Sequence, residues 1–181
     1  GGLSIGNPMS LTAVIAVYAA ISKELGLPLR FPGTPAGYSA LHQATDAQLL
    51  AQATAWTATN PACRNEIFNV TNGDYFRWEN LWPQFADYFE MPVAPPQTIR
   101  LTEFMSDKAP LWDRMREKHR LADWPYAQVA AWGFGDAAIH RHWDSVSNVN
   151  KLKAFGFLDW VDSEEMFIRL FDQMREARLI P

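Results

Sequence analysis

The stretch that decides the fold spans residues 66–88 and reads EIFNVTNGDYFRWENLWPQFADY. Its residues 67–70 form a short apolar run with the length and composition of a buried strand. Asn72-Gly73 then predicts a turn, and the aromatic-rich residues 77–89 predict a helix that Pro83 should bend. A strand, a turn and a helix in this order indicate an α/β fold.

Helices and strands alternate before this stretch, whereas helices dominate after it. We expect a helix, a strand and a second helix over residues 11–25, 29–31 and 46–59. Ser10 and Thr45 are the expected N-caps of the two helices, and Gly26 is the expected stop of the first helix. Downstream, prolines at 92, 95 and 96 mark a stiff connection, and Asp162 with Glu165 forms a capping box before a last helix. This order predicts the edge of a parallel sheet followed by a helical cap.

The composition limits the class of protein. A chain of 181 residues is one domain, or one domain plus part of another. Eight Trp and eleven Phe residues indicate a large aromatic core, or a core together with an aromatic-lined cavity for an apolar ligand. A net charge of -4 without a basic patch argues against a nucleic-acid partner. The single Cys63 excludes an internal disulfide, and a reducing cytoplasm fits it best.

Several catalytic motifs are absent from the sequence. It holds no glycine-rich dinucleotide turn, and none of its five Tyr residues is followed by Lys four positions later. His140 and His142 would point about 200° apart on a helix, so they are poor joint metal ligands. The longest apolar run, residues 11–21, is about half of the ~20 residues that a membrane span needs. We therefore expect no catalytic residue, no metal site and no membrane span in this chain, and its cofactor contacts stay unknown.

The 66–88 stretch resembles the last strand, turn and helix of extended short-chain dehydrogenases/reductases. It is most similar to the progesterone 5β-reductase and iridoid synthase-like enone reductases. Further motifs match that group in the same order: GNPMSLTAVIAVYAAI, LRFPGTPAGY, TDAQLLAQATAWTAT, WGFGD, LKAFGFLDW and ARLIP. The resemblance implies the C-terminal part of an extended Rossmann-type reductase, with a few sheet strands and a mainly helical substrate-binding cap. Residues 1–91 would then carry the distal Rossmann elements, and residues 92–181 the substrate-binding region.

The resemblance also implies an activity and its partners. The complete enzyme would use NADPH or NADH to reduce the activated C=C bond of a hydrophobic enone. An N-terminal Rossmann portion would supply the cofactor site and the catalytic Tyr and Lys, so this chain alone is expected to be inactive. An unpaired sheet edge also allows a homodimer. The residues expected in the substrate pocket are Met9, His42, Phe134, Trp132 and Trp143.

Two other readings of the sequence stay open. A sugar-nucleotide epimerase or dehydratase shares the extended Rossmann fold, but its pocket needs polar and basic groups for a diphosphate. A non-catalytic helical binding domain agrees with the missing motifs, but not with the order of the matched motifs or with a bare sheet edge.

Overall fold

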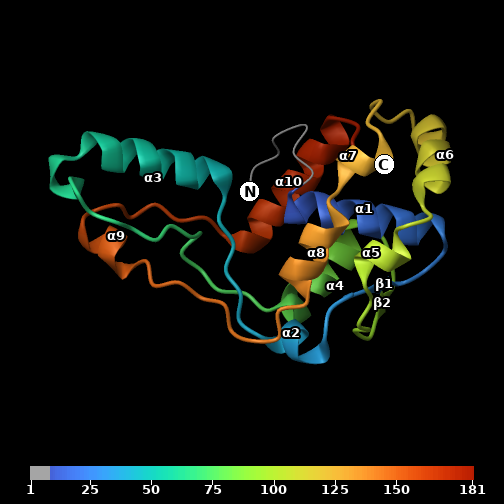
Figure 1. Ribbon diagram of the computed structural model, residues 1–181, viewed down its shortest axis with the longest axis horizontal. Helices are drawn as coiled ribbons and strands as arrows, with labels where there is room; N and C mark the ends of the chain where they lie inside the picture. The colour runs from blue at the N-terminus through green and yellow to red at the C-terminus, as the bar shows by residue number, and fades with distance from the viewer. Residues whose placement is uncertain (1–8) are drawn as a thin grey trace.

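A computed structural model describes residues 9–181 of the protein. Figure 1 shows a main helical body and a smaller lobe beside it that contains α3 and α9. In chain order the elements are α1 Leu11–Glu24, β1 Leu29–Arg30, α2 Pro35–Ser39, α3 Ala47–Thr59, the 3-10 helix η1 Pro61–Cys63, α4 Trp78–Tyr88, β2 Val93–Ala94, α5 Leu101–Phe104, α6 Ala109–His119, α7 Tyr126–Val129, α8 Trp132–Ile139, α9 Asn150–Ala154 and α10 Ser163–Glu176.

Helix α1 is the centre of the main body, as its apolar circumference predicts. Eleven consecutive residues, from Thr12 to Ser22, are buried, and α6, α7, α8, α10 and β1 all pack against the helix. The Ser10 hydroxyl caps its first turn by accepting a hydrogen bond from the N–H of Ala13. Gly26 follows the helix with φ +69°, a left-handed conformation that glycine adopts without strain. Both predicted ends of α1 are therefore confirmed.

Helix α4 buries the aromatic face that the sequence predicts. Trp82 and Phe85 are completely buried. The Trp82 ring lies 5.1 Å from that of Phe31, and the Phe85 ring lies 5.3 Å from that of Phe167 on α10. Pro83 lies inside the helix without dividing it into two assigned helices. The helix thus joins the strand region to α10 through aromatic contacts.

The sheet differs from the prediction in two strands. Leu29–Arg30 is a strand as predicted, and it pairs in parallel with Val93–Ala94, which was not predicted, in the register Leu29 to Val93 and Arg30 to Ala94. The strand predicted at residues 67–70 does not form within residues 9–181, where no segment pairs with it. A strand exists only where a neighbour accepts and donates its backbone hydrogen bonds. Ile67 accordingly remains 85% exposed.

The smaller lobe has an apolar cluster of its own. Leu49 and Ala53 of α3 pack with Leu152 of α9 and with Phe157. The N-cap of α3 is Asp46, not Thr45 as predicted. The Asp46 carboxylate accepts hydrogen bonds from the N–H groups of residues 48 and 49 and forms an ion pair with Arg169. The Thr45 hydroxyl instead donates to the carbonyl of Val70. The partly exposed Arg169 thereby links α10 of the main body to the lobe.

Asn72 joins the lobe to the body at the turn in the 66–88 stretch. Its side chain is fully buried. The amide oxygen accepts a hydrogen bond from the Asp46 N–H at 2.6 Å, and the amide nitrogen lies 3.0 Å from the Ser163 hydroxyl oxygen and 3.3 Å from the Met166 sulfur. One side chain thus connects the starts of α3 and α10. Across residues 9–181, no helix has the length and apolar character to cross a membrane.

Candidate functional site

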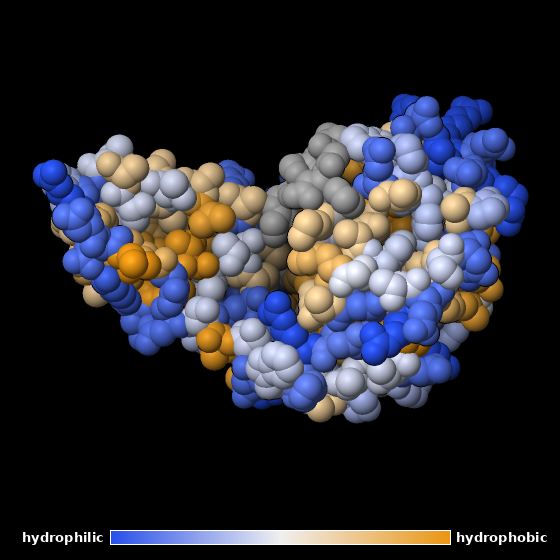
Figure 2. Space-filling model, viewed as in Figure 1, coloured by the Kyte–Doolittle hydropathy of each residue, from blue (hydrophilic) through white to orange (hydrophobic). Residues whose placement is uncertain are grey.

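A cavity of about 270 Å³ lies where α1, α8 and α10 meet the segment that leads into α3. Figure 2 shows the surface hollowed between the smaller lobe and the main body. The cavity is lined by Leu11, Thr12, His42, Gln43, Ala44, Thr45, Phe76, Trp78, Phe134, Ala138, Arg141, Met166 and Phe167. Eight of the thirteen described lining residues are apolar or aromatic and five are polar, with Arg141 as the one Lys or Arg among them. Such a lining suits a neutral, largely apolar ligand.

His42 is the buried titratable group of this cavity. Its backbone exchanges two hydrogen bonds with Phe76, at 2.8 and 3.0 Å, which fixes the ring beside the aromatic wall. The ring Nε2 lies 3.0 Å from the carbonyl oxygen of Gly37. A carbonyl only accepts, so Nε2 carries the proton of the neutral ring and Nδ1 remains an acceptor. Burial lowers the pKa of His42, although the Gly37 carbonyl opposes this shift.

Trp78 supplies a donor to the same wall. Its indole ring is 2% exposed and lies 5.7 Å from the His42 ring and 4.9 Å from the Phe76 ring, measured between centroids. The indole Nε1–H has no hydrogen-bond partner within the described part of the chain. Buried donors normally find an acceptor. That nitrogen is also shielded from solvent, so the unpartnered donor lies beneath the cavity surface, beside the His42 and Phe76 rings.

Phe134 reaches the cavity from α8. The helix lies against α1 and α5, and its residues Gly135 and Asp136 are buried there. Asp136 accepts hydrogen bonds from the N–H groups of Leu101 and Thr102 at 2.7 and 3.1 Å. Gly135 and Asp136 thus hold α8 against α1 and α5, while Phe134 of the same helix lines the cavity.

The five residues predicted for the pocket are not all in this cavity. His42 and Phe134 line it, although 92 positions separate them. Met9, Trp132 and Trp143 are not among its lining residues. Met9 is 62% exposed, the Trp132 ring packs 6.0 Å from that of Tyr126, and Trp143 is 56% exposed beside His142. Contact between any of the five and a substrate stays a prediction.

The sequence analysis missed other lining residues that carry a readable signal. Phe76 and Trp78 stand two positions apart just before and at the start of α4, and in extended backbone such residues point to the same side. Met166 and Phe167 belong to the apolar stripe of α10, where the sequence indicates burial but not a cavity. Alternation before α4 was therefore the available clue to this wall.

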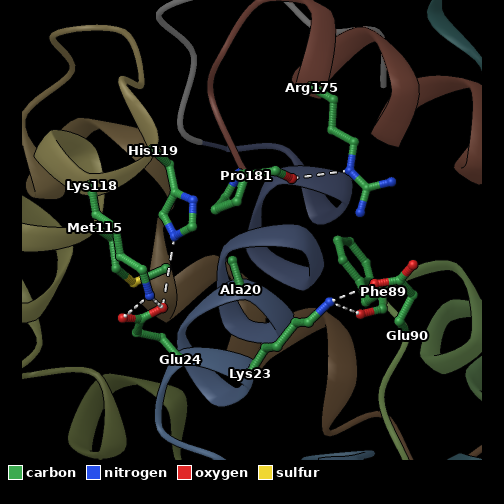
Figure 3. Close-up of a pocket in the computed structure, with 10 residues that line it drawn as sticks. All are labelled: Ala20, Lys23, Glu24, Phe89, Glu90, Met115, Lys118, His119, Arg175 and Pro181. Atoms are coloured by element: carbon green, nitrogen blue, oxygen red, sulfur yellow. Dashed lines mark hydrogen bonds and ion pairs between the residues drawn. The ribbon is translucent and has the colours of Figure 1, made fainter.

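A larger cavity of about 550 Å³ lies at the other end of α1, as Figure 3 shows. Its lining residues are Ala20, Lys23, Glu24, Phe89, Glu90, Met115, Lys118, His119, Arg175 and Pro181. Lys118 pairs with Glu24 at 2.9 Å and Lys23 with Glu90 at 3.1 Å. These ion pairs bridge neighbouring elements across the cavity. A neutral, flat ligand would have to compete with them, so we do not assign this cavity to substrate.

Residues 9–181 contain no group of three or more His, Cys, Asp or Glu side chains placed to hold a metal ion. His140 follows α8 and its Nε2 lies 3.2 Å from the Pro32 carbonyl oxygen and 3.1 Å from that of Ile99. Its contacts tie α8 to the strand region.

Comparison with known proteins places the chain in a family. Residues 4–181 match the PRISE-like Rossmann-fold domain. An (S)-8-oxocitronellyl enol synthase of Nepeta cataria is 33% identical over 99% of this chain and 47% of its own length. Enzymes of the same name from Nepeta racemosa and Catharanthus roseus are 34% and 32% identical, again over 99% of this chain and over 46% and 47% of their lengths.

The chain thus spans about half the length of the curated relatives it matches. The match extends almost from end to end and includes every motif quoted above, which confirms the resemblance and the α/β, extended Rossmann-type fold class. The chain belongs to the family of PRISE-like Rossmann-fold domains.

Proposed function

We propose that this chain is the substrate-binding C-terminal portion of an NAD(P)H-dependent reductase of activated C=C bonds in enones. The aromatic cavity bounded by His42, Trp78 and Phe134 is the observation that carries the proposal. It offers apolar contact to a hydrocarbon skeleton and a few polar atoms to an oxygen. The named activity of the relatives, (S)-8-oxocitronellyl enol synthase, supports an enone or enal as the substrate class.

In the proposed enzyme this chain binds and orients the substrate. Bound NADPH or NADH would supply the hydride for the β-carbon of the alkene. The electron pair of the C=C bond would move toward the carbonyl and give an enolate, which donors outside this chain would stabilise. Residues 1–91 would provide distal Rossmann elements and residues 92–181 most of the helical wall. The aromatic residues of the lining would cover one side of the bound substrate and reduce its contact with water.

The charge of the cavity disfavours a sugar nucleotide as the substrate. A diphosphate carries at least two negative charges and is normally held by several cations or helix N-termini. Arg141 is the one Lys or Arg among the lining residues. Burying a diphosphate against Phe76 and Phe167 would leave most of its charge unpaired, which is costly.

The lack of a neighbouring strand at residues 66–70 supports the proposed N-terminal partner. This segment forms no helix or strand, and the chain places no strand beside it within the described residues. A parallel neighbour supplied by an N-terminal Rossmann portion would pair with the backbone groups that the contacts to Cys63, Thr45 and Lys151 leave open. A second copy of the chain is the alternative occupant when that portion is absent.

A turnover assay on the full-length protein tests the proposal. NADPH and NADH oxidation is followed with 2-cyclohexen-1-one, a monoterpenoid enal and a uridine diphosphate sugar. We expect saturable oxidation with the first two substrates and none with the third. Turnover of the sugar nucleotide alone would replace this proposal by the epimerase or dehydratase reading, and absence of all turnover would favour a binding domain.

A further inference from the structure

Gly135 seats α8 directly on α1 and α5. A Cβ atom at this position would lie 2.6 Å from Cγ1 of Val14 and 3.1 Å from Cδ1 of Leu101. Real Cβ atoms do not approach a neighbour to 2.6 Å, and Val14 is completely buried, so it has little room to move. Any side chain at position 135 would therefore push α8 away from α1.

Asp136, the next residue, locks α8 to the start of α5. Its Oδ1 accepts from the Leu101 N–H at 2.7 Å, while Oδ2 accepts from the Thr102 N–H at 3.1 Å and from the Thr102 hydroxyl at 2.8 Å. The N-cap of α5, Arg100, makes no side-chain cap hydrogen bond. A carboxylate from another helix thus satisfies the open N–H groups of α5. Because Asp136 is itself buried, the link is shielded from water.

These two contacts lie one and two residues beyond Phe134, which lines the cavity. We propose that Gly135 and Asp136 are positioning residues that set the depth of Phe134 in the substrate cavity. The inference rests on the proposed function of that cavity. It gives the second half of the WGFGD motif a structural role. Phe134 lines the cavity, while Gly135 and Asp136 pack against α1 and α5 on other sides of the same helix.

The same motif provides a matched control. Gly133 is exposed, and the nearest atom to a Cβ added there is Cγ2 of Thr102 at 4.0 Å, an ordinary van der Waals contact. Gly133→Ala and Gly135→Ala therefore make the same chemical change in one helix, and only the second collides with a neighbour. For Asp136 the control is Asp172, a carboxylate that accepts a hydrogen bond from the Tyr88 hydroxyl at 2.8 Å and lies outside the cavity lining.

The experiment measures kcat/KM of the full-length protein for a bulky enone and for 2-cyclohexen-1-one. The ratio of interest is kcat/KM for the bulky enone divided by kcat/KM for 2-cyclohexen-1-one. In Gly135→Ala and Asp136→Asn we expect this ratio to change on the order of tenfold, because small displacements in a site alter transition-state positioning strongly. Gly133→Ala and Asp172→Asn should change this ratio less than about twofold, as expected of independent sites. Thr102→Val, which removes one hydrogen bond without a clash, provides a milder variant if the others fold poorly.

A double-mutant cycle separates positioning from a general loss of structure. If Gly135 and Asp136 act through Phe134, their substitution should have no further effect once Phe134 is replaced by Ala. Adding Gly135→Ala or Asp136→Asn to Phe134→Ala should then leave the kcat/KM ratio of the two substrates as it is in Phe134→Ala alone. Additive effects, or equal ratios in Gly133→Ala and Gly135→Ala, would overturn the inference.

Hydrogen exchange makes the test independent of turnover. Amides of residues 101–104 and 132–139 should exchange faster in Gly135→Ala and Asp136→Asn than in the two controls. Suppose that the variants show this faster exchange but the wild-type protein reduces no enone. The proposed function then fails, while the contacts of Gly135 and Asp136 still hold α8 in place without a role in substrate binding. If exchange is unchanged in both variants, the clamp itself is refuted.

Discussion

Asn72→Ala should destabilise the protein more than any other single change in the turn of the 66–88 stretch. The substitution removes the acceptor of the buried Asp46 N–H and the donor to the Ser163 hydroxyl. An unsatisfied buried N–H costs about 1–3 kcal/mol, and each further lost hydrogen bond costs about 1 kcal/mol. The void left by a fully buried amide adds about 1 kcal/mol. Together these effects predict a loss of about 3–5 kcal/mol in the free energy of unfolding.

Urea unfolding followed by circular dichroism measures this loss, and an unchanged slope with denaturant would show that the two-state comparison holds. Asn148→Ala is the control, because Asn148 is exposed and its side chain accepts one hydrogen bond, from the N–H of Asn150. That variant should lose about 0.5–1 kcal/mol. If Asn72→Ala and Asn148→Ala lost the same amount, the argument that Asn72 joins the lobe to the body would be wrong.

Three further predictions concern pH, activity and substrate size. Because burial lowers the pKa of His42 below its ordinary value of 6.5, the unfolded state binds more protons than the folded state under mildly acidic conditions. The contribution of His42 to the free energy of unfolding should be fully present above pH 6.5 and should fall as the pH drops through that value, by at most about 1.4 kcal/mol per pH unit. His42→Gln should remove this part of the pH dependence. Parallel curves of unfolding free energy against pH for the two proteins would contradict the assignment. The 181-residue chain alone should show no enone-dependent oxidation of NADPH, since its sequence contains neither a glycine-rich dinucleotide turn nor a Tyr with Lys four residues on; activity above background would refute the view that the catalytic groups lie outside it. Phe134→Ala in the full-length protein should lower kcat/KM more for a bulky enone than for 2-cyclohexen-1-one, and an equal fall for both would remove Phe134 from the pocket wall.

Local signals predicted the helices well because their causes are local. Ser10 before an apolar run, Gly26 after it, and the pair Asp162 and Glu165 each act within a few residues, and the structure places caps or stops at all of them. The N-cap of α3 shows where this reasoning ends. Thr45 and Asp46 are both good caps, and the choice of Asp46 is favoured by Arg169, which is 123 residues away in the chain.

Long-range pairing explains the other differences. The run 67–70 has the composition of a strand, yet composition cannot supply the neighbour that makes it one. Val93–Ala94 pairs with β1 although it has only two residues and follows directly after Pro92. The cavity is similar: His42 and Phe134 could be paired only through a family resemblance, and Gly135 acquires its meaning only from Val14 on another helix.

The buried indole of Trp78 allows ligand binding in the cavity to be followed by tryptophan fluorescence. Trp78, Trp82 and Trp112 are all buried with unpartnered N–H groups, so their native fluorescence belongs at the short-wavelength edge, whereas Trp143 and Trp160 are 56% and 65% exposed and should emit as in water. Of the three buried indoles, Trp78 is the one that lines the cavity. A ligand that fills the cavity should displace water beside the Trp78 ring, change the emission of that component and leave the other two unchanged. The protein therefore carries its own optical reporter, through which ligands can be titrated without a label and without turnover.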